Sequence, residues 1–160
     1  MGLDMYLYLE KYESCSRFNE DYKQKKDTFY PEELEVFKID ERNFMSKETL
    51  YQIGYWRKAN AIHNWIVTNC ADGEDRCQRI YLTTKDLEKL LSLVNQVLEN
   101  HDLADQLLPT VDGFFFGNKN YDEWYFKDLE YTKELLEKLL AFMKDNKMSM
   151  DYDIIYQASW

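Results

Sequence analysis

The stretch LDMYLYLE, residues 3–10, is the clearest signal for the fold. Apolar residues occupy one set of alternate positions, Leu3, Met5, Leu7 and Leu9, and aromatic or charged residues occupy the other. Successive side chains of a β-strand point to opposite faces of a sheet. The alternation therefore predicts a strand with one buried face and one partly solvated face.

The segments after this strand predict a mixture of loops and further strands. Residues 11–30 are polar and charged, so we expect a surface excursion that is partly helical, and Pro31 then predicts a short helix over residues 31–38. Residues 49–53 predict a second strand, and Gly54 predicts a break after it. Three further segments predict strands: residues 77–82, 111–117 and 151–156.

The clearest helix begins after Thr83, which forms a capping-box pattern with Asp86. Apolar residues then recur with helical spacing and predict a helix that ends near Asn100; they are Leu87, Leu90, Leu91, Val94 and Leu98. A short helical turn is expected over residues 102–108. A long amphipathic helix is expected over residues 121–145.

Residues 55–69 predict another helix, followed by a turn at residues 71–75. At 100° per residue, its apolar residues fall on one side: Tyr55, Trp56, Ala59, Ile62, Ile66 and Val67, with His63 at their centre. Strands thus occur before, between and after helices, and no internal repeat is visible. This order predicts an α+β fold in one globular domain over residues 1–160, with about four to five strands in a mainly antiparallel sheet and two long helices packed on one face.

Charge and composition exclude several classes of function. The net charge is −10, from 30 acidic and 20 basic residues, so broad binding to nucleic acid or to anionic membranes is not expected. No apolar run approaches the roughly 20 residues of a membrane span, and the N-terminus lacks the features of a secretion signal. Three cysteines without a CxxC pattern and two histidines argue against a structural zinc site and favour a reducing cytosol, so no cofactor or metal is expected.

The polar side of the helix expected over residues 55–69 is the first candidate site. It carries Arg57, Asn60 and Asn64 in one stripe, next to Lys58. An arginine offers a fork of donors and an asparagine offers both a donor and an acceptor, so the stripe could bind a phosphate, a carboxylate or a base edge. The alternative is a solvated stripe in which Arg57 pairs with a nearby acid. The ligand contacts expected from this segment come from Trp56, Arg57, Asn60, His63 and Asn64.

His63 has two interpretations of its own. A histidine on an apolar face is most often a hydrogen-bonded core residue, but a neutral imidazole in a cleft could also act as a base or as a donor to a ligand. A dyad with Cys70 or Cys77 is conceivable, although no GxSxG or HExxH motif indicates a catalytic centre. Enzymatic activity is therefore not the favoured hypothesis.

The second candidate site is the aromatic segment over residues 113–126. Glycines bracket its phenylalanine run, and the tyrosines and tryptophan that follow would share a face if helical. Aromatic rings stack on bases and sugars, and a neighbouring carboxylate could accept from a ribose hydroxyl. The alternative is that the phenylalanines belong to the core. The ligand contacts expected here come from Phe116, Tyr121, Asp122, Trp124 and Tyr125.

Three blocks of the chain resemble a group of uncharacterised small proteins encoded by bacteriophages and prophages. They are MGLDMYLYLEK at the start, YWRKANAIHNWIV over residues 55–67 and LPTVDGFFFGNKNYDEWYFKDLEYT over residues 108–132. The resemblance implies a viral protein acting in the bacterial cytosol. It transfers no functional residue, because no activity is established for the group.

Three functional hypotheses follow. The favoured one is a protein that binds a small polar or nucleotide-like ligand, such as a nucleotide-derived host defence signal that it sequesters. The alternative is an acidic inhibitor of a host defence enzyme that mimics the charge of DNA, because residues 68–160 hold 18 acidic and 10 basic residues. A small enzyme that uses His63 as a base is less expected. Exposed tyrosines could equally form a homo-oligomer interface.

Overall fold

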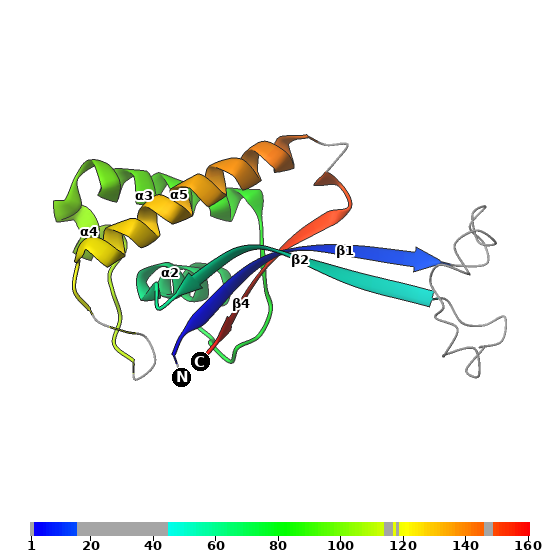
Figure 1. Cartoon of the computed structure of the whole chain (residues 1–160), viewed down its shortest axis with the longest axis horizontal. Coiled ribbons are helices and arrows are strands. Elements are labelled where there is room, and N and C mark those ends of the chain that lie inside the picture. Colours follow the sequence, from blue (N-terminus) through cyan, green and yellow to red (C-terminus); the bar gives the residue numbers. More distant parts are fainter. Residues whose placement is uncertain (1, 16–44, 114–116, 118, 146–148) are drawn as a thin grey trace.

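The computed structural model describes residues 2–15, 45–113, 117, 119–145 and 149–160 (Figure 1). Within these described residues, four strands form one antiparallel sheet in the order β2-β1-β4-β3. They are β1 (Asp4–Cys15), β2 (Met45–Arg57), β3 (Ile80–Leu82) and β4 (Tyr152–Ser159). The described helices are α2 (Asn60–Cys70), α3 (Thr84–Glu99), α4 (Ala104–Leu107) and α5 (Glu123–Lys144), with a 3-10 turn, His101–Leu103, before α4. The predicted α+β class with an antiparallel sheet is thus confirmed.

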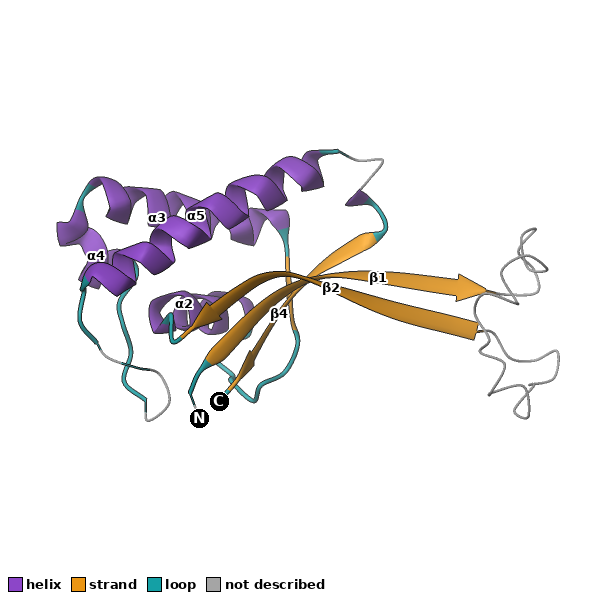
Figure 2. Cartoon of the chain, viewed as in Figure 1, coloured by secondary structure: helices purple, strands orange, loops and turns teal. Residues whose placement is uncertain are grey.

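Strand β1 confirms the alternation that opened the sequence over residues 3–7, where Leu3, Met5 and Leu7 are at most 1% exposed. The alternation does not hold at its end, since Leu9 is only partly buried and Glu10, expected on the solvated face, is 5% exposed. The strand continues to Cys15, so the prediction of a surface excursion from residue 11 is wrong for residues 11–15. Their backbone groups pair with the first part of β2, and the two strands project beyond the rest of the sheet as a ribbon (Figure 2). The remainder of the excursion and the helix predicted over residues 31–38 lie outside the described residues.

Strand β2 passes straight through Gly54, where the sequence predicted a break. Its pairing with β1 shifts there, since Leu7 lies opposite Gly54 and Tyr8 opposite Gln52, which leaves Ile53 as the extra residue of a bulge. A Cβ atom at Gly54 would collide with the side chain of Leu135 on α5 and would lie 3.2 Å from the Cβ of Leu7. The glycine therefore permits the close approach of a helix to the sheet.

Helix α2 begins five residues later than predicted, because residues 55–57 belong to β2. They pair with Tyr6, Met5 and Asp4 of β1. The chain then turns at Lys58, whose φ of 64° lies in the left-handed region. Arg57 and Asn60 consequently stand on different elements, and the predicted stripe of Arg57, Asn60 and Asn64 along one helix is wrong.

The two long helices follow the sequence closely. Thr83 and Asp86 form the predicted capping box, with Asp86 N donating to Thr83 Oγ1 at 3.2 Å and Thr83 N donating to Asp86 Oδ2 at 2.9 Å. Helix α3 ends with Asn100 as its cap. Helix α5 occupies nearly the whole of the segment predicted as helical. The expected packing of both long helices on one face of the sheet stays a prediction.

Two predicted strands differ from the structure. Strand β3 covers only Ile80–Leu82 of the segment 77–82, since Cys77 has a φ of 56° and cannot extend the strand. Residues 111–113 are not in a strand, and residues 114–116, including Phe116, lie outside the described residues. The closing strand over residues 151–156 is confirmed as β4.

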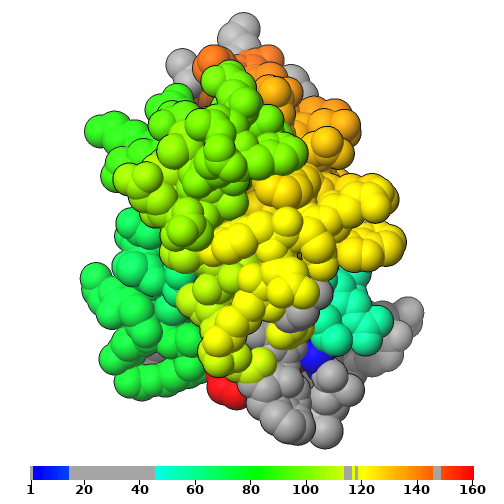
Figure 3. Space-filling view, turned by 90° about the vertical axis from the view of Figure 1, so that its left-hand side faces the viewer, coloured from blue at the N-terminus to red at the C-terminus, as the bar shows by residue number. Residues whose placement is uncertain are grey.

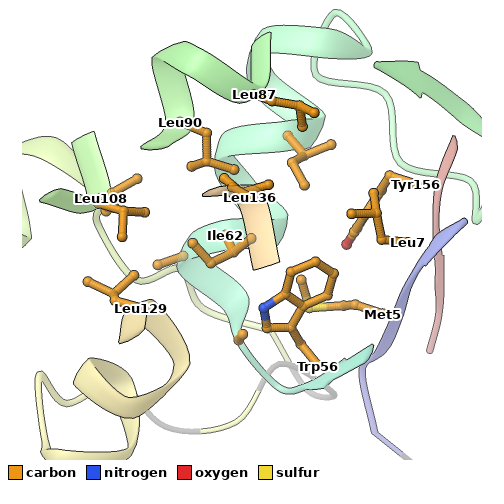
Figure 4. Packing of buried hydrophobic residues seen from close by; sticks show 14 of the residues in the cluster. Met5, Leu7, Trp56, Ile62, Leu87, Leu90, Leu108, Leu129, Leu136 and Tyr156 are labelled. Carbon is orange, nitrogen blue, oxygen red and sulfur yellow. The ribbon is translucent and has the colours of Figure 1, made fainter. Parts of the chain in front are cut away.

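A single buried cluster joins the sheet to the helices (Figure 4). It includes Leu7 and Trp56 from the sheet, Ile62 from α2, Leu90 from α3 and Leu136 from α5. Trp56 Nε1 donates to Thr132 Oγ1 at 2.8 Å, and both residues are buried. This hydrogen bond fixes α5 on β2 and so positions the start of α5 beside the end of β2.

Candidate functional site

A pocket of about 470 Å³ lies where the end of β2, the start of α2 and the start of α5 come together. Figure 3 shows this side of the molecule, with the start of α5 in yellow bordering the cyan end of β2. The pocket is lined by charged, polar and aromatic groups as well as backbone: Arg57, Lys58, Ala59, Asn60, Ala61, Ile62, Thr110, Gly117, Asn120, Asp122, Trp124, Tyr125, Asp128 and Leu129. Residues from both sequence-predicted sites therefore meet in one place.

The cationic side of the pocket is built by the turn from β2 into α2. Lys58 N donates to Leu3 O at 2.8 Å, and Lys58 O accepts from Asn60 N at 2.8 Å, so the backbone bends sharply at Lys58. Gly117 packs against this turn with a φ of 90°, and a Cβ atom there would lie 3.2 Å from the Cβ of Lys58. Arg57 is largely exposed, and its Nε lies 4.0 Å from Asp4 Oδ1. Such a long, exposed ion pair contributes little and leaves the guanidinium able to contact a ligand.

The start of α2 adds a second positive element. Its N-cap residue, Ala59, has no side chain that could accept a hydrogen bond from the helix, and the first turn holds no acidic residue. The first backbone N–H groups of a helix lack intrahelical acceptors and carry a partial positive charge. Ala61 and Ile62 line the pocket at this point. An anion placed there would meet both the helix terminus and the adjacent cations.

Asn60 is buried rather than exposed, and it supports the wall of the pocket. Its Oδ1 accepts from Val111 N at 3.1 Å, which holds the segment before α5 against the start of α2. A hydrogen bond between a side chain and a distant backbone group of this kind fixes a loop. Asn60 thus has a structural role, and its role as a ligand contact stays a prediction.

The opposite side of the pocket is the first turn of α5, which Asp122 caps. Asp122 Oδ1 accepts from Trp124 N at 3.0 Å and from Tyr125 N at 3.1 Å. Tyr125 is buried and donates through its hydroxyl to Leu108 O at 2.9 Å, and burial raises the pKa of this phenol. Trp124, by contrast, is 71% exposed, and Lys127 Nζ lies 4.8 Å from its ring centre. An indole that exposed can stack on a ligand ring.

One residue that the sequence did not indicate also lines the pocket. Asp128 stands one helical turn after Trp124, and burial together with the charge of Asp122 raises the pKa of its carboxyl group to about 6. It occupies the apolar side of α5, close to Tyr125, Leu129 and Thr132 in helical spacing. A carboxylate inside an apolar stripe is the sequence signal that could have singled it out.

Several predicted contacts lie away from the pocket. Trp56 is a core residue bonded to Thr132, Asn64 accepts from Thr68 Oγ1 at 3.4 Å, and Tyr121 packs edge-on against Tyr125 with ring centres 5.0 Å apart. None of these three is among the pocket-lining residues. Tyr121 precedes α5, so it shares no helical face with Trp124 and Tyr125 as the sequence had suggested.

His63 is a buried hydrogen-bonded residue, as one of its two interpretations proposed. Its Nε2 lies 2.9 Å from Asp75 Oδ2 and its Nδ1 lies 2.7 Å from the Tyr156 hydroxyl. Burial lowers the pKa of His63, and Asp75 opposes that shift. In the neutral ring, Nε2–H donates to Asp75 and Nδ1 accepts from Tyr156. Burial also raises the pKa of the Cys70 thiol to about 11, which is the reverse of what an activated nucleophile needs.

The part of the chain that the structure describes contains neither a candidate metal site nor a candidate membrane-spanning helix. No group of three or more histidine, cysteine, aspartate or glutamate side chains there could hold a metal ion. No helix there has the length and apolar character needed to span a bilayer.

Comparison with known proteins does not identify a family or an activity for the chain. No protein-family model and no solved structure matches the chain. A stretch of 79 residues, 48% of this chain, is 27% identical to the GTPase-activating protein MSB4 of Saccharomyces cerevisiae. The match spans only 16% of the yeast protein, so it shows neither a shared family nor a shared activity.

Proposed function

We propose that this protein binds a small ligand that combines an anionic group with a flat ring, of which a nucleotide is the best example. The observation that carries the proposal is the composition of one pocket: Arg57, Lys58 and the start of α2 on one side and the exposed ring of Trp124 on the other. Cations beside a helix N-terminus suit a phosphate or carboxylate, and an exposed indole suits a base.

The size and charge of the pocket support the same ligand. Its volume of about 470 Å³ falls in the range of about 300–1,000 Å³ that is typical of small-molecule sites. The whole chain has a net charge of −10, so most of its surface repels an anion. The junction of β2 and α2 supplies two neighbouring cations, Arg57 and Lys58, which would attract an anionic ligand to this side of the pocket.

The biological role we propose is sequestration of a nucleotide-derived signal in the cytosol of a bacterium infected by a phage. Support for this role comes from the resemblance of the three sequence blocks to phage and prophage proteins, and from a site that offers binding groups. Sequestration needs only affinity, so it requires no catalytic group. Protein purified from its expression host and then denatured should release the bound molecule, which mass spectrometry would identify.

The test of the pocket itself is a thermal-shift titration with mononucleotides. A nucleotide present at 100 times its dissociation constant should stabilise the protein by about 2.7 kcal/mol. Arg57→Ala should abolish the shift. Arg76→Ala is the matched control, because Arg76 is exposed, pairs only with Glu74 among the described residues and does not line the pocket. Equal shifts in both variants, or no shift with any nucleotide, would remove the support for this function.

The alternative is an acidic inhibitor that occupies the basic DNA-binding surface of a host enzyme. The excess of 18 acidic over 10 basic residues in residues 68–160 favours it. This function predicts an interaction that weakens steeply with salt and is insensitive to Arg57→Ala. Charge reversal of exposed acids on α5, such as Glu130→Lys with Glu137→Lys, should then abolish inhibition while leaving nucleotide binding unaffected.

A further inference from the structure

Asp128 lines the pocket with a carboxylate that has no hydrogen-bond or ion-pair partner among the described residues. The backbone oxygen of Asp128, not its carboxylate, accepts from Thr132 Oγ1 at 2.6 Å. The charge of Asp122, which has the same sign, contributes to raising the pKa of Asp128, and the described ion partner of Arg57 is Asp4. A half-buried carboxylate in this state is costly unless a donor reaches it.

The position of Asp128 relative to Trp124 indicates which kind of hydrogen-bond donor could reach the Asp128 carboxylate. The two residues are four positions apart on α5, so their side chains are neighbours on one face of the helix. A ring that stacks on the indole would therefore present its edge toward the carboxylate. A carboxylate has two oxygens and accepts two parallel N–H bonds, as it does from arginine.

Among the bases, guanine offers two adjacent N–H donors on one edge, at its N1 and its exocyclic amine. Adenine and cytosine each offer a donor next to an acceptor on that edge, and an acceptor would face an oxygen of Asp128 without a proton between them. A buried group that is left unpaired by the wrong ligand is a strong source of discrimination.

We propose that the pocket is specific for a guanine nucleotide, with Asp128 accepting from the base edge, Trp124 stacking on its face, and the phosphate lying at Arg57, Lys58 and the start of α2. The inference rests on the proposed function, since it names the base for the same site. It adds a specificity-determining residue, Asp128, to a pocket whose affinity for phosphate is assigned to other residues.

Calorimetric titration at pH 7.5 with four probes tests the assignment: GMP, IMP, which lacks the exocyclic amine, XMP, which replaces the amine by a carbonyl, and AMP. The wild-type protein should bind GMP at least about tenfold more tightly than the other three. Asp128→Asn replaces one acceptor by a donor, so it should weaken GMP by at least about tenfold and should strengthen XMP. Glu130→Gln makes the same change of carboxylate to amide on an exposed position of α5 and should leave all four affinities unchanged.

The pH dependence separates a base contact from mere proximity to the phosphate. If Asp128 accepts from guanine, the ratio of GMP affinity to AMP affinity should rise as pH rises from 5 to 7.5, because Asp128 must be ionised, whereas the phosphates of both nucleotides gain their second charge alike over this range. If Asp128 only neighbours the phosphate, both nucleotides should respond in the same way and the ratio should stay constant. A constant ratio would overturn the inference.

The remaining outcomes distinguish the two proposals. Equal binding of all four nucleotides, with Asp128→Asn indistinguishable from Glu130→Gln, would overturn guanine specificity and leave the anion pocket standing. No binding of any nucleotide would overturn both. Circular dichroism of each variant establishes that it is folded before its affinities are compared.

Discussion

The hydrogen bond between Trp56 and Thr132 provides the sharpest test of how α5 is held on the sheet. Thr132→Val keeps the size and branching of the side chain but removes its oxygen, so the indole N–H of Trp56 is left buried without its acceptor. Thr132 is fully buried and Trp56 is 3% exposed, so water cannot replace the lost bond. An unsatisfied buried donor costs about 1–3 kcal/mol, and we expect a loss of about 2 kcal/mol in the free energy of unfolding. For a domain of this size that corresponds to a decrease in Tm of about 4–8 °C.

Urea unfolding followed by circular dichroism measures this loss, and two comparisons identify its cause. Thr132→Ser keeps the hydroxyl and should retain the hydrogen bond, so it should cost about 1 kcal/mol or less for the missing methyl group. In a Trp56→Phe background, which has no indole N–H, Thr132→Val should cost less than about 0.5 kcal/mol further. An equal cost of Thr132→Val in both backgrounds would refute the reasoning, as would a loss below 0.5 kcal/mol in the wild-type protein.

Three further perturbations have defined outcomes. Thr83→Ala removes the capping box of α3 and should destabilise the protein by about 1 kcal/mol in urea unfolding, with no effect on nucleotide affinity. Burial lowers the pKa of His63 in the folded protein, so the unfolded chain binds a proton at this residue more tightly. The free energy of unfolding should therefore keep its full contribution from neutral His63 above about pH 6.5 and should fall as pH decreases below that value. His63→Gln should remove this part of the dependence of the free energy of unfolding on pH. The pKa of Asp128 is raised to about 6, so the ionisation of its carboxyl group opposes folding as pH rises from about 4 to 6. Asp128→Asn should therefore be more stable than the wild-type protein at pH 7 and equally stable near pH 4. Glu130→Gln should show no such difference.

The sequence predicts well those elements whose own periodicity decides them. The alternation at residues 3–10 and the helical spacing after Thr83 are local patterns, and the structure has a strand and a capped helix there. The break predicted at Gly54 is wrong because a contact between residues distant in the sequence decides the structure there. As a local signal a glycine indicates a break, but its place in β2 is explained by Leu135, which is distant in the sequence and packs on it.

The candidate site shows the same division between local and long-range information. The helical wheel of residues 55–69 placed Arg57 on a helix, because it could not register the left-handed turn at Lys58 that separates β2 from α2. The residue types near Arg57 and Trp124 still indicated an anion and a ring, and both groups line one pocket. The place of Asp128 in the apolar stripe of α5 is a sequence signal, but its burial in the pocket and the effect of Asp122 on its pKa depend on the three-dimensional structure.

The most direct test of the central claim is a titration of ¹⁵N-labelled protein with GMP, followed by the chemical shifts of the backbone amides and the indole groups. If the phosphate lies at the start of α2 and the base on α5, the largest changes should occur at the amides of Ala61 and Ile62 and at the indole N–H of Trp124. The buried indole of Trp56 and the amide of Tyr81, on the far edge of the sheet, should change little. Changes centred on the sheet around Tyr81, or no changes with GMP at millimolar concentration, would contradict the account.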